Sequence, residues 1–469
     1  MFFSARSPSL SAGLRGGGAS ESDRYRPCGR TEPSLWTRSL MTKASRTFPA
    51  VMGTMRGHVA LLALFAQRAT ACTTVMVRTA SDDCLVVGRT MELSIPKVRS
   101  ELEQIYLHSR GTPVGTVHGK LNASRYGYLA VQFNIGKSTL RMATTEGINE
   151  AGLTVSAQIH EGASYEGNAS TKSITMFDIQ ATAFLLACCK TVDEAAEALA
   201  SVHVVATPGI GVLGALHWSV QDATGRSRVF EYIDESLRLY DNSEVGVLTN
   251  DPSYEWHLAH LNFFSDYPAT PHTPQFHPTV HSSGRFSTAS VPVGGDGTQV
   301  TTTTVPVYSG HGLNTRGLPA SYSPVDRFVK MFLLKETAVR QDPPTTLDDG
   351  IVLVTGLLNT VHIVRGTVTG GPALLPLPLE TTNWACVKVP SAPGGTANNE
   401  VNGNGSNGRA ALFFYRTYDN MQWKKIDLGK VNFAAGTTHA PIALYEPGLG
   451  IKDVTPTRSS ASPAVGSQQ

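Results

Sequence analysis

The sequence predicts an α+β fold in which β-sheets are layered between helices. Three observations support this fold class: strand patterns open the region after residue 71, two helical patterns follow, and strand patterns then resume. The chain has 469 residues, of which 41% are hydrophobic, so it can bury a large core in one or two domains.

The predicted strands are short β-prone runs bounded by turn residues. The first two flank a polar turn at residues 81–83 and therefore predict a hairpin. The last two predicted strands, at 384–389 and 410–416, form a second hairpin. In chain order, the strands are expected at 73–79, 84–90, 126–133, 153–159, 216–220, 229–232, 384–389 and 410–416.

Four segments carry apolar side chains at helical spacing or a helix start signal. Residues 175–189 predict one helix, and Thr191 with Glu194 three positions later is a capping box that opens an Ala-rich second helix. Residues 324–339 and 347–360 predict two more.

Composition predicts the loops between these elements. Residues 266–320 are rich in Pro, Ser, Thr, Gly and His and indicate a long surface excursion. Residues 391–408 are rich in Gly and Asn and are expected to be flexible, and the tail at 455–469 is expected to be disordered. We therefore expect one domain over residues 72–454.

Residues 1–71 differ from the rest of the chain in charge. They hold ten of the 39 basic residues and three of the 37 acidic ones, which leaves 29 bases and 34 acids, or about −5, on the remainder. A mildly acidic body gives no reason to expect nucleic-acid binding.

The end of this basic leader is typical of a secretory signal peptide. Arg56 precedes a short apolar run at 59–66, and the small residues Ala69, Thr70 and Ala71 predict cleavage after Ala71. The alternative is a buried core helix. Residues 1–54 are interpreted either as an unused upstream start or as an organelle-targeting extension. No stretch reaches the roughly 18–20 apolar residues of a membrane span. A secreted or lumenal location, lysosome or vacuole included, is expected.

Cysteine parity and glycosylation signals are compatible with that route. Removal of the leader discards Cys28 and leaves five cysteines, so at least one thiol cannot pair within the chain. Asn-x-Ser triplets at Asn122, Asn168 and Asn404 are potential glycosylation acceptors.

Cleavage before Cys72 would give this residue an unusual chemistry. An α-amine with an ordinary pKa of about 7.7–8.0 would share one residue with a thiol of pKa about 8.5. The amine could take the thiol proton, directly or through a water, so nucleophile and base would need no separate histidine. The alternative is a buried cysteine with no catalytic role.

Five ordered segments resemble the choloylglycine hydrolase and penicillin V acylase family of N-terminal-nucleophile hydrolases. Together they extend from Cys72 to about Phe433. The segments are 72–74 (CTT) with 88–92 (GRTME), 147–153 (GINEAGL), 248–252 (LTNDP) with 256–258 (WHL), 323–329 (SPVDRFV) and 415–420 (YRTYDN). The resemblance implies a four-layer αββα sandwich and hydrolysis of a linear carboxamide in a small N-acyl compound.

The resemblance also implies roles at matched positions. Cys72 would be the nucleophile, and the Arg89 cation beside it would favour the thiolate. Asn250 would donate its side-chain amide to the oxyanion, with the backbone N–H of Ile159 as second donor. Arg327 would hold the polar network of the site. The alternatives are a strand-pairing Arg89, a turn-forming Asn250 and an ordinary helix-start Arg327.

The sequence departs from the family pattern at three places. Glu92 stands where many members have Asp, and its longer carboxylate is expected near the ammonium or thiol of the nucleophile. One extra residue separates Cys72 from Arg89, which the turn at 81–83 can absorb. Ile159 stands where some members have Asn, which removes a side-chain contribution.

Other chemistries find less support in the sequence. His160 and His257 lack the surroundings of a cysteine-protease dyad, and His257 is expected to pack on an apolar helix. Cys188 and Cys189 are adjacent, which is not zinc-ligand spacing, and residues 209–212 lack a phosphate-loop pattern. We therefore expect no metal and no cofactor.

Two rival functions remain open at this point. One is an amidase acting on N-acyl lipids such as ceramides, which would use the same nucleophile. The other is a secreted binding protein that has lost catalysis, although Cys72, Arg89, Asn250 and Arg327 are all present. The oligomeric state is left open, with a homo-oligomer as one alternative.

Overall fold

The structure is a computed structural model. It describes residues 71–92, 103–133, 143–167, 171–208, 215–264, 287–293, 301–307, 315, 317–370, 377–392, 410–446 and 450. The chain divides into residues 1–56 and 57–469, and all described residues lie in the second unit. The predictions for the leader before Ala71, for most of the segment 391–408 and for the tail at 455–469 therefore lie outside the described residues.

A six-stranded antiparallel sheet carries the start of the domain. Its strand order is β12-β1-β2-β17-β18-β19. The strands are β1 (Cys72–Arg78), β2 (Leu85–Glu92), β12 (Val247–Leu248), β17 (Thr382–Ala392), β18 (Ala410–Thr417) and β19 (Lys424–Asp427). Both predicted hairpins are present, because β1 pairs with β2 and β17 with β18.

A second antiparallel sheet has eight strands in the order β11-β10-β9-β6-β5-β4-β3-β20. The strands are β3 (Glu103–His108), β4 (Tyr128–Phe133), β5 (Ala143–Asn149), β6 (Thr154–Ile159), β9 (Leu216–Gln221), β10 (Ser227–Ile233), β11 (Ser236–Asp241) and β20 (Ile442–Ala443). Four of these, β4, β6, β9 and β10, match predicted strands within a few residues.

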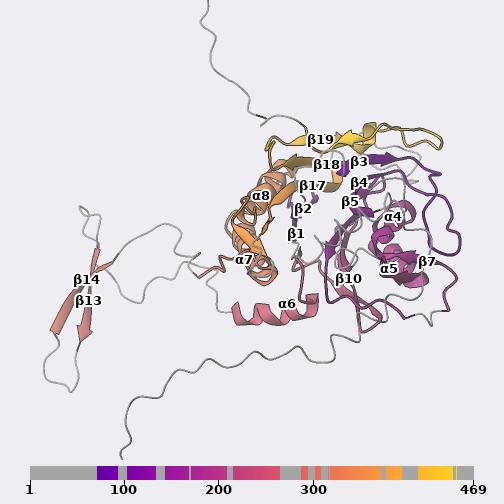
Figure 1. Cartoon of the computed structure of the whole chain (residues 1–469). Helices are drawn as coiled ribbons and strands as arrows, with labels where there is room; N and C mark the ends of the chain where they lie inside the picture. The colour runs from indigo at the N-terminus through magenta and orange to yellow at the C-terminus, as the bar shows by residue number, and fades with distance from the viewer. Residues whose placement is uncertain are drawn as a thin grey trace, which may run out of the picture. The chain divides into compact units, whose positions relative to one another are not determined.

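Helices cover the outer face of each sheet, as Figure 1 shows. Helices α7 (Pro324–Gln341) and α8 (Leu347–Thr360) share an apolar core with the six-stranded sheet. Helices α4 (Asp178–Cys188) and α5 (Val192–Ser201) share another with the eight-stranded sheet. A third core, which includes Leu129, Trp384 and Phe413, lies between the two sheets. The predicted four-layer αββα sandwich is confirmed.

Shorter elements connect these layers. They are β7 (Thr175–Phe177), β8 (His203–Val205), α6 (Tyr254–Leu261), η3 (Asn262–Phe264), β13 (Ser287–Val293), β14 (Thr301–Val307), β15 (Val368–Gly370), β16 (Leu377–Glu380) and η5 (Leu428–Lys430). Among the described residues, no helix combines the length and hydropathy that a bilayer span requires.

The structure corrects two local predictions. The helix predicted at 175–189 begins only at Asp178, because Thr175–Phe177 form strand β7, which pairs in parallel with β8. The predicted excursion at 266–320 contains the antiparallel pair β13–β14. The β-branched run at 301–307 favours that strand, and the overall composition of the segment obscured it.

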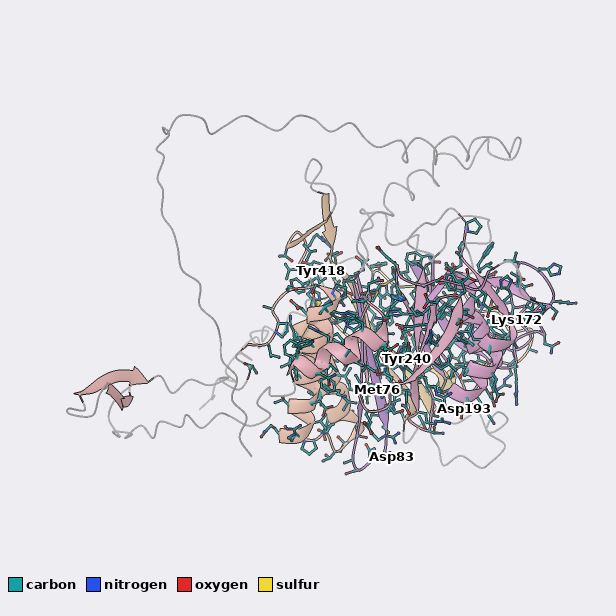
Figure 2. The ribbon with its side chains drawn as sticks, turned by 90° about the horizontal axis from the view of Figure 1, so that it is seen from below. Met76, Asp83, Lys172, Asp193, Tyr240 and Tyr418 are labelled. Atoms are coloured by element: carbon teal, nitrogen blue, oxygen red, sulfur yellow. The ribbon has the colours of Figure 1, made fainter. Side chains whose placement is uncertain are left out.

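The β1–β2 hairpin brings the first residue of the domain beside the Arg-Thr-Met-Glu segment. Cys72 pairs with Met91 and Thr74 with Arg89. The turn lies at the far end of the hairpin, where Thr79 and Cys84 exchange hydrogen bonds, and Figure 2 shows Asp83 at that end. An extra residue there leaves the pairing next to Cys72 undisturbed.

Candidate active site

Each polar atom of Cys72 has its own buried partner. The backbone nitrogen donates to Asn250 Oδ1 at 2.7 Å, and the carbonyl oxygen accepts from Arg327 Nη1 at 2.6 Å. The thiol sulfur lies 3.5 Å from Arg89 Nη2 and 3.6 Å from Met91 Sδ. Only 2% of Cys72 is exposed. Three separate segments of the chain therefore hold one residue at the edge of the inter-sheet core.

Strand pairing places Asn250 opposite Cys72. Strand β12 runs antiparallel to β1 with Thr74 opposite Leu248, so continuation of that register by two residues sets Asn250 against Cys72. The Asn250 amide nitrogen donates to the carbonyl oxygen of Ile159 at 2.8 Å, and Asn250 Oδ1 also accepts from Arg327 Nη2 at 2.9 Å. Asn250 thus joins the ends of β1, β6 and α7.

The backbone N–H of Ile159 lies on the same side as this contact. Ile159 is opposite Leu216 on β9, and the next residue, His160, donates its N–H to Ala215 at 2.8 Å. In an antiparallel ladder this makes Ile159 a non-hydrogen-bonded position, so its N–H and C=O both face away from β9. The carbonyl meets the Asn250 amide, and the N–H therefore faces the same space. The structure brings the two predicted oxyanion donors together.

Arg327 lies at the start of α7, where Ser323 caps the helix by accepting from Asp326 N–H. Its side chain is fully buried. Besides Cys72 and Asn250, it donates to Thr73 Oγ1 at 2.6 Å and to the carbonyl of Tyr322 at 2.9 Å. These contacts tie the helix start to the first residues of β1.

Arg89 reaches from β2 into the space between the sheets. The β5–β6 pairing covers residues 146–148 and 154–156, and just beyond it the guanidinium donates to the carbonyls of Thr145 and Ala157, both at 2.6 Å. Arg89 also lies over the Trp384 ring, 5.3 Å from its centroid. It is therefore held rigidly beside the thiol.

Two residues that the sequence analysis missed complete this charge cluster. Glu146 Oε2 lies 3.2 Å from Arg89 Nη1, and Glu146 Oε1 lies 2.6 Å from the Lys388 amine. Lys388 also donates to Ser156 Oγ at 2.7 Å. All three charged side chains are fully buried. The only sequence signals were an acid before the GINEAGL segment and a lysine inside a predicted strand.

Glu92 lies at the end of β2 beside the backbone of the nucleophile. Its N–H donates to the carbonyl of Ala71 at 2.9 Å, and its carboxylate accepts from the hydroxyls of Thr90 at 3.2 Å and Thr382 at 2.8 Å. Its negative charge acts on the Cys72 thiol. The longer side chain therefore reaches the neighbourhood expected of it.

The pKa of the Cys72 thiol is raised in the uncleaved chain, although Arg89 acts on it in the predicted direction. Burial raises the pKa most strongly, Arg89 lowers it, and the negative charge of Glu92 raises it further. The net direction is upward, because desolvation outweighs the guanidinium in the uncleaved chain. A thiol in this setting remains protonated unless a base takes its proton.

The two histidines considered as dyad partners lie elsewhere. His160 contacts Asp251 Oδ1, and His257 Nε2 lies 3.0 Å from the carbonyl oxygen of Asn250. His257 also packs flat on Phe328, as its place on an apolar helix predicted. Within the described residues, no group of three or more His, Cys, Asp or Glu side chains is arranged to hold a metal ion.

Solved structures share this fold. A variant of the conjugated bile acid hydrolase from Clostridium perfringens has a TM-score of 0.59 and 22% identity, covering 82% of this chain and 99% of that one. Penicillin V acylase from Agrobacterium tumefaciens has a TM-score of 0.53 and 18% identity, covering 78% and 89%. The four-layer sandwich is that of the N-terminal-nucleophile hydrolases.

Sequence comparison defines the family. The profile described as linear amide C–N hydrolases, choloylglycine hydrolase family, matches residues 72–302, beginning at Cys72 itself. The bile salt hydrolase/transferase of Clostridium perfringens is 26% identical over 294 residues, which is 61% of this chain and 73% of the relative. Penicillin V acylase of Pectobacterium atrosepticum is 28% identical over 148 residues, 30% of this chain and 39% of the relative. The chain belongs to the choloylglycine hydrolase family and is a hydrolase of C–N bonds in linear amides.

The buried charge cluster makes a prediction about stability. Glu146→Gln leaves Arg89 and Lys388 buried without their shared carboxylate, so the free energy of unfolding should fall by about 3–5 kcal/mol. Lys388→Met keeps the Arg89–Glu146 pair, and Glu146 Oε1 still accepts from Gly147 N–H at 2.9 Å, so its loss should be clearly smaller. Urea unfolding of both variants measures the difference, and equal losses would contradict this account of the cluster.

Proposed function

We propose that the chain, once freed of the residues before Cys72, hydrolyses a small N-acyl amide through a thioester on Cys72. The observation that supports this most directly is that the nitrogen, the carbonyl oxygen and the sulfur of this residue each have a separate buried hydrogen-bond partner. A structural cysteine needs none of these contacts. A terminal nucleophile needs all of them, because its amine, backbone and thiol must each keep a fixed direction.

The first step would form the thioester. The Cys72 sulfur adds to the amide carbonyl carbon while its proton passes to the α-amine, directly or through a water. The charge that develops on the carbonyl oxygen is met by the Asn250 side-chain amide and the Ile159 N–H. Collapse breaks the C–N bond, and the departing amine takes the proton back from the α-ammonium.

The second step would regenerate the enzyme. A water molecule adds to the thioester carbonyl with the α-amine again accepting the proton. The same two donors stabilise the second oxyanion, because the acyl carbon has not moved. Breakage of the C–S bond releases the carboxylic acid and restores the thiol.

The upward shift of the thiol pKa supports a base on the same residue. In the described part of the chain, the side chains that hydrogen-bond to the sulfur are those of Arg89 and Met91, a guanidinium and a thioether, and neither takes up a proton near neutral pH. The Cys72 nitrogen is already fixed by Asn250 Oδ1. Cleavage would turn that nitrogen from an amide into an amine without requiring a new contact.

The substrate class follows from the family. The relatives are named as enzymes acting on bile salts and on penicillin V. In the family as a whole, an apolar acyl part is joined to a polar amine, and we propose the same general class here. Neither the ceramide-type alternative nor a binding protein without catalysis gains support from these matches.

We also propose that residues 1–71 direct the chain to the secretory route and are removed before it acts. The family match that begins at Cys72 supports this boundary. Asn122, one of the three glycosylation triplets, is exposed, as an acceptor must be. Asn168 and Asn404 lie outside the described residues.

The nucleophile assignment is tested by alkylation. Brief iodoacetamide treatment of the mature protein should label Cys72 first, because a freed α-ammonium adds a second cation to Arg89 beside the thiol. Burial holds the other thiols back: it raises the pKa of Cys188, the most exposed of them, to about 11. Cys72→Ser should nearly abolish hydrolysis. Full activity with Cys72 completely alkylated, read by mass spectrometry, would falsify the assignment.

The α-amine makes a second prediction. A variant that keeps one unremovable residue before Cys72 should fold but not turn over, because an amide nitrogen has no basic lone pair. Its matched control carries a protease site at the same junction, and cleavage should restore activity, with N-terminal sequencing confirming Cys72 as the first residue. Turnover by the blocked variant would remove the case for an α-amine base.

The assignment of Asn250 as an oxyanion donor predicts how far kcat should fall when its side chain is removed. Asn250→Ala should lower kcat by about 10²–10³ with little change in KM, the range for loss of one oxyanion donor. Asn149→Ala is the matched control, because Asn149 is also a buried turn residue whose amide binds backbone carbonyls, at the far end of β5. It should lower the melting temperature but not kcat. A fall in stability alone at Asn250 would favour the turn-residue alternative.

A further inference from the structure

The turn at residues 249–251, here termed the Asn250 turn, is held by buried histidines from separate elements. His217 on β9 lies with Nε2 3.0 Å from the carbonyl oxygen of Thr249. His257 on α6 lies with Nε2 3.0 Å from the carbonyl oxygen of Asn250. A carbonyl oxygen only accepts, so both Nε2 atoms must carry hydrogen. Two successive carbonyls of the turn are therefore fixed by imidazole donors.

A third histidine lies beside the end of the turn. His160, which follows β6, lies with Nδ1 3.0 Å from Asp251 Oδ1, and its ring stacks on His217 with centroids 5.0 Å apart. The Asp251 carboxylate also accepts from the N–H groups of Glu161 at 2.8 Å and Gly162 at 2.9 Å. The Asn250 turn is thus tied to the segment that follows Ile159.

Glu231 on β10 connects two of these histidines. Its Oε1 lies 2.8 Å from His217 Nδ1, and both of its oxygens accept from Tyr254 N–H at 3.0 Å. Tyr254 is the first residue of α6, the helix that carries His257. Glu231 and His217 are both fully buried. One carboxylate therefore sets the position of one histidine directly and of the other through the start of its helix.

The hydrogen atoms of this network can be assigned. His217 Nε2 must carry a hydrogen, and its Nδ1 faces a carboxylate, so a bond there needs one more hydrogen between them. Burial acts to raise the Glu231 pKa, but the hydrogen bond and charge of His217 lower it further, and the net pKa lies below its usual range. The Glu231 carboxylate is therefore the acceptor in this bond, and a buried hydrogen bond joins it to His217.

His257 is neutral in the same network. Burial lowers its pKa to about 4, with the charges of His217 and Arg327 acting in the same direction and the Asn250 carbonyl and Glu231 opposing. Its one hydrogen lies on Nε2, while Nδ1 has no hydrogen-bond partner among the described residues. The ring of His257 stacks on that of Phe328, with ring centroids 4.4 Å apart and an angle of 9° between the ring planes.

We propose that Glu231, His217 and His257 are positioning residues that aim the Asn250 side chain at the reacting carbonyl. This rests on the proposed role of Asn250 as an oxyanion donor. None of the three contacts the Cys72 sulfur. Their contacts instead fix two consecutive carbonyls of the Asn250 turn, so the backbone from which the donor projects cannot rotate without breaking a buried hydrogen bond.

The test is a split between turnover and substrate binding. Glu231→Ala should lower kcat by about 10–10² with KM changed less than about threefold, because a donor displaced by about 1 Å loses that much. Glu231→Gln should restore kcat to within about threefold of the natural enzyme. Its amide can donate to His217 Nδ1 and accept from Tyr254 N–H, which leaves the His217 bond to Thr249 intact.

Glu150→Ala is the matched control. Glu150 is also a buried carboxylate that binds a cation and a backbone N–H, through Arg110 and Gly127 at 2.7 Å, but it lies at the opposite end of β6 from Ile159. It should destabilise the protein without lowering kcat. An equal kcat loss in Glu150→Ala, or failure of Glu231→Gln to rescue, would overturn the proposal.

His257→Phe keeps the test valid if Glu231→Ala does not fold. The phenyl ring preserves the stack on Phe328 and removes the Nε2 contacts to the Asn250 carbonyl and to Thr249 Oγ1, so kcat should fall by about tenfold with a smaller fall in melting temperature than in Glu231→Ala. Unchanged kcat in this variant would overturn the proposal.

Alkylation of Cys72 separates this proposal from the proposed function. Iodoacetamide forms no oxyanion, so its rate at Cys72 should change less than about threefold in Glu231→Ala and His257→Phe while kcat falls. A parallel loss of alkylation and turnover would overturn a role through Asn250. Activity retained in Cys72→Ser would instead reject the proposed function itself.

Discussion

The structure depends on keeping the first residue of β1 at the edge of a closed core between two sheets. Burial of the Cys72 thiol excludes water from it but also makes its ionised form costly. The surrounding elements supply fixed polar contacts to this residue in place of water. Asn250, Arg327 and Arg89 lie on three segments that are distant in sequence, and each forms a hydrogen bond with a different atom of Cys72. The αββα layering is what lets these segments end at one place.

Charge balance limits how such a site can be built. Arg89 and Lys388 are buried cations, and each is matched by Glu146, which bridges them from β5. A buried cation without that match would carry a desolvation penalty of several kcal/mol. The Arg89 guanidinium also replaces a missing stretch of ladder by binding the carbonyls of Thr145 and Ala157, where β5 and β6 separate. The arginine beside the thiol is therefore part of the sheet packing as well as of the site.

The sequence predicted the layers and the residues that contact Cys72, because strand patterns and ordered motifs record local preference and chain order. It did not predict Glu146, Lys388, His217 or Glu231. These side chains come from strands up to 242 residues apart and meet only when the sheets stack. The net upward shift of the Cys72 pKa in the uncleaved chain could not be anticipated for the same reason: Arg89 lowers this pKa, as the motif predicts, but complete burial of the thiol depends on packing. The hairpin in the segment 266–320 was missed because composition averaged over a long segment hides a short β-branched run.

The position of the base follows from what surrounds the sulfur. Arg89 remains protonated and Met91 has no proton to exchange, so neither partner can accept the thiol proton. The Glu92 carboxylate is nearby, but it accepts from two hydroxyl groups and its charge works against ionisation of the thiol. The nitrogen of Cys72 lies on the same residue and already donates to Asn250. In the proposed mechanism one asparagine therefore has two tasks: its oxygen orients the base, and its nitrogen faces the same space as the Ile159 N–H, where the oxyanion would form.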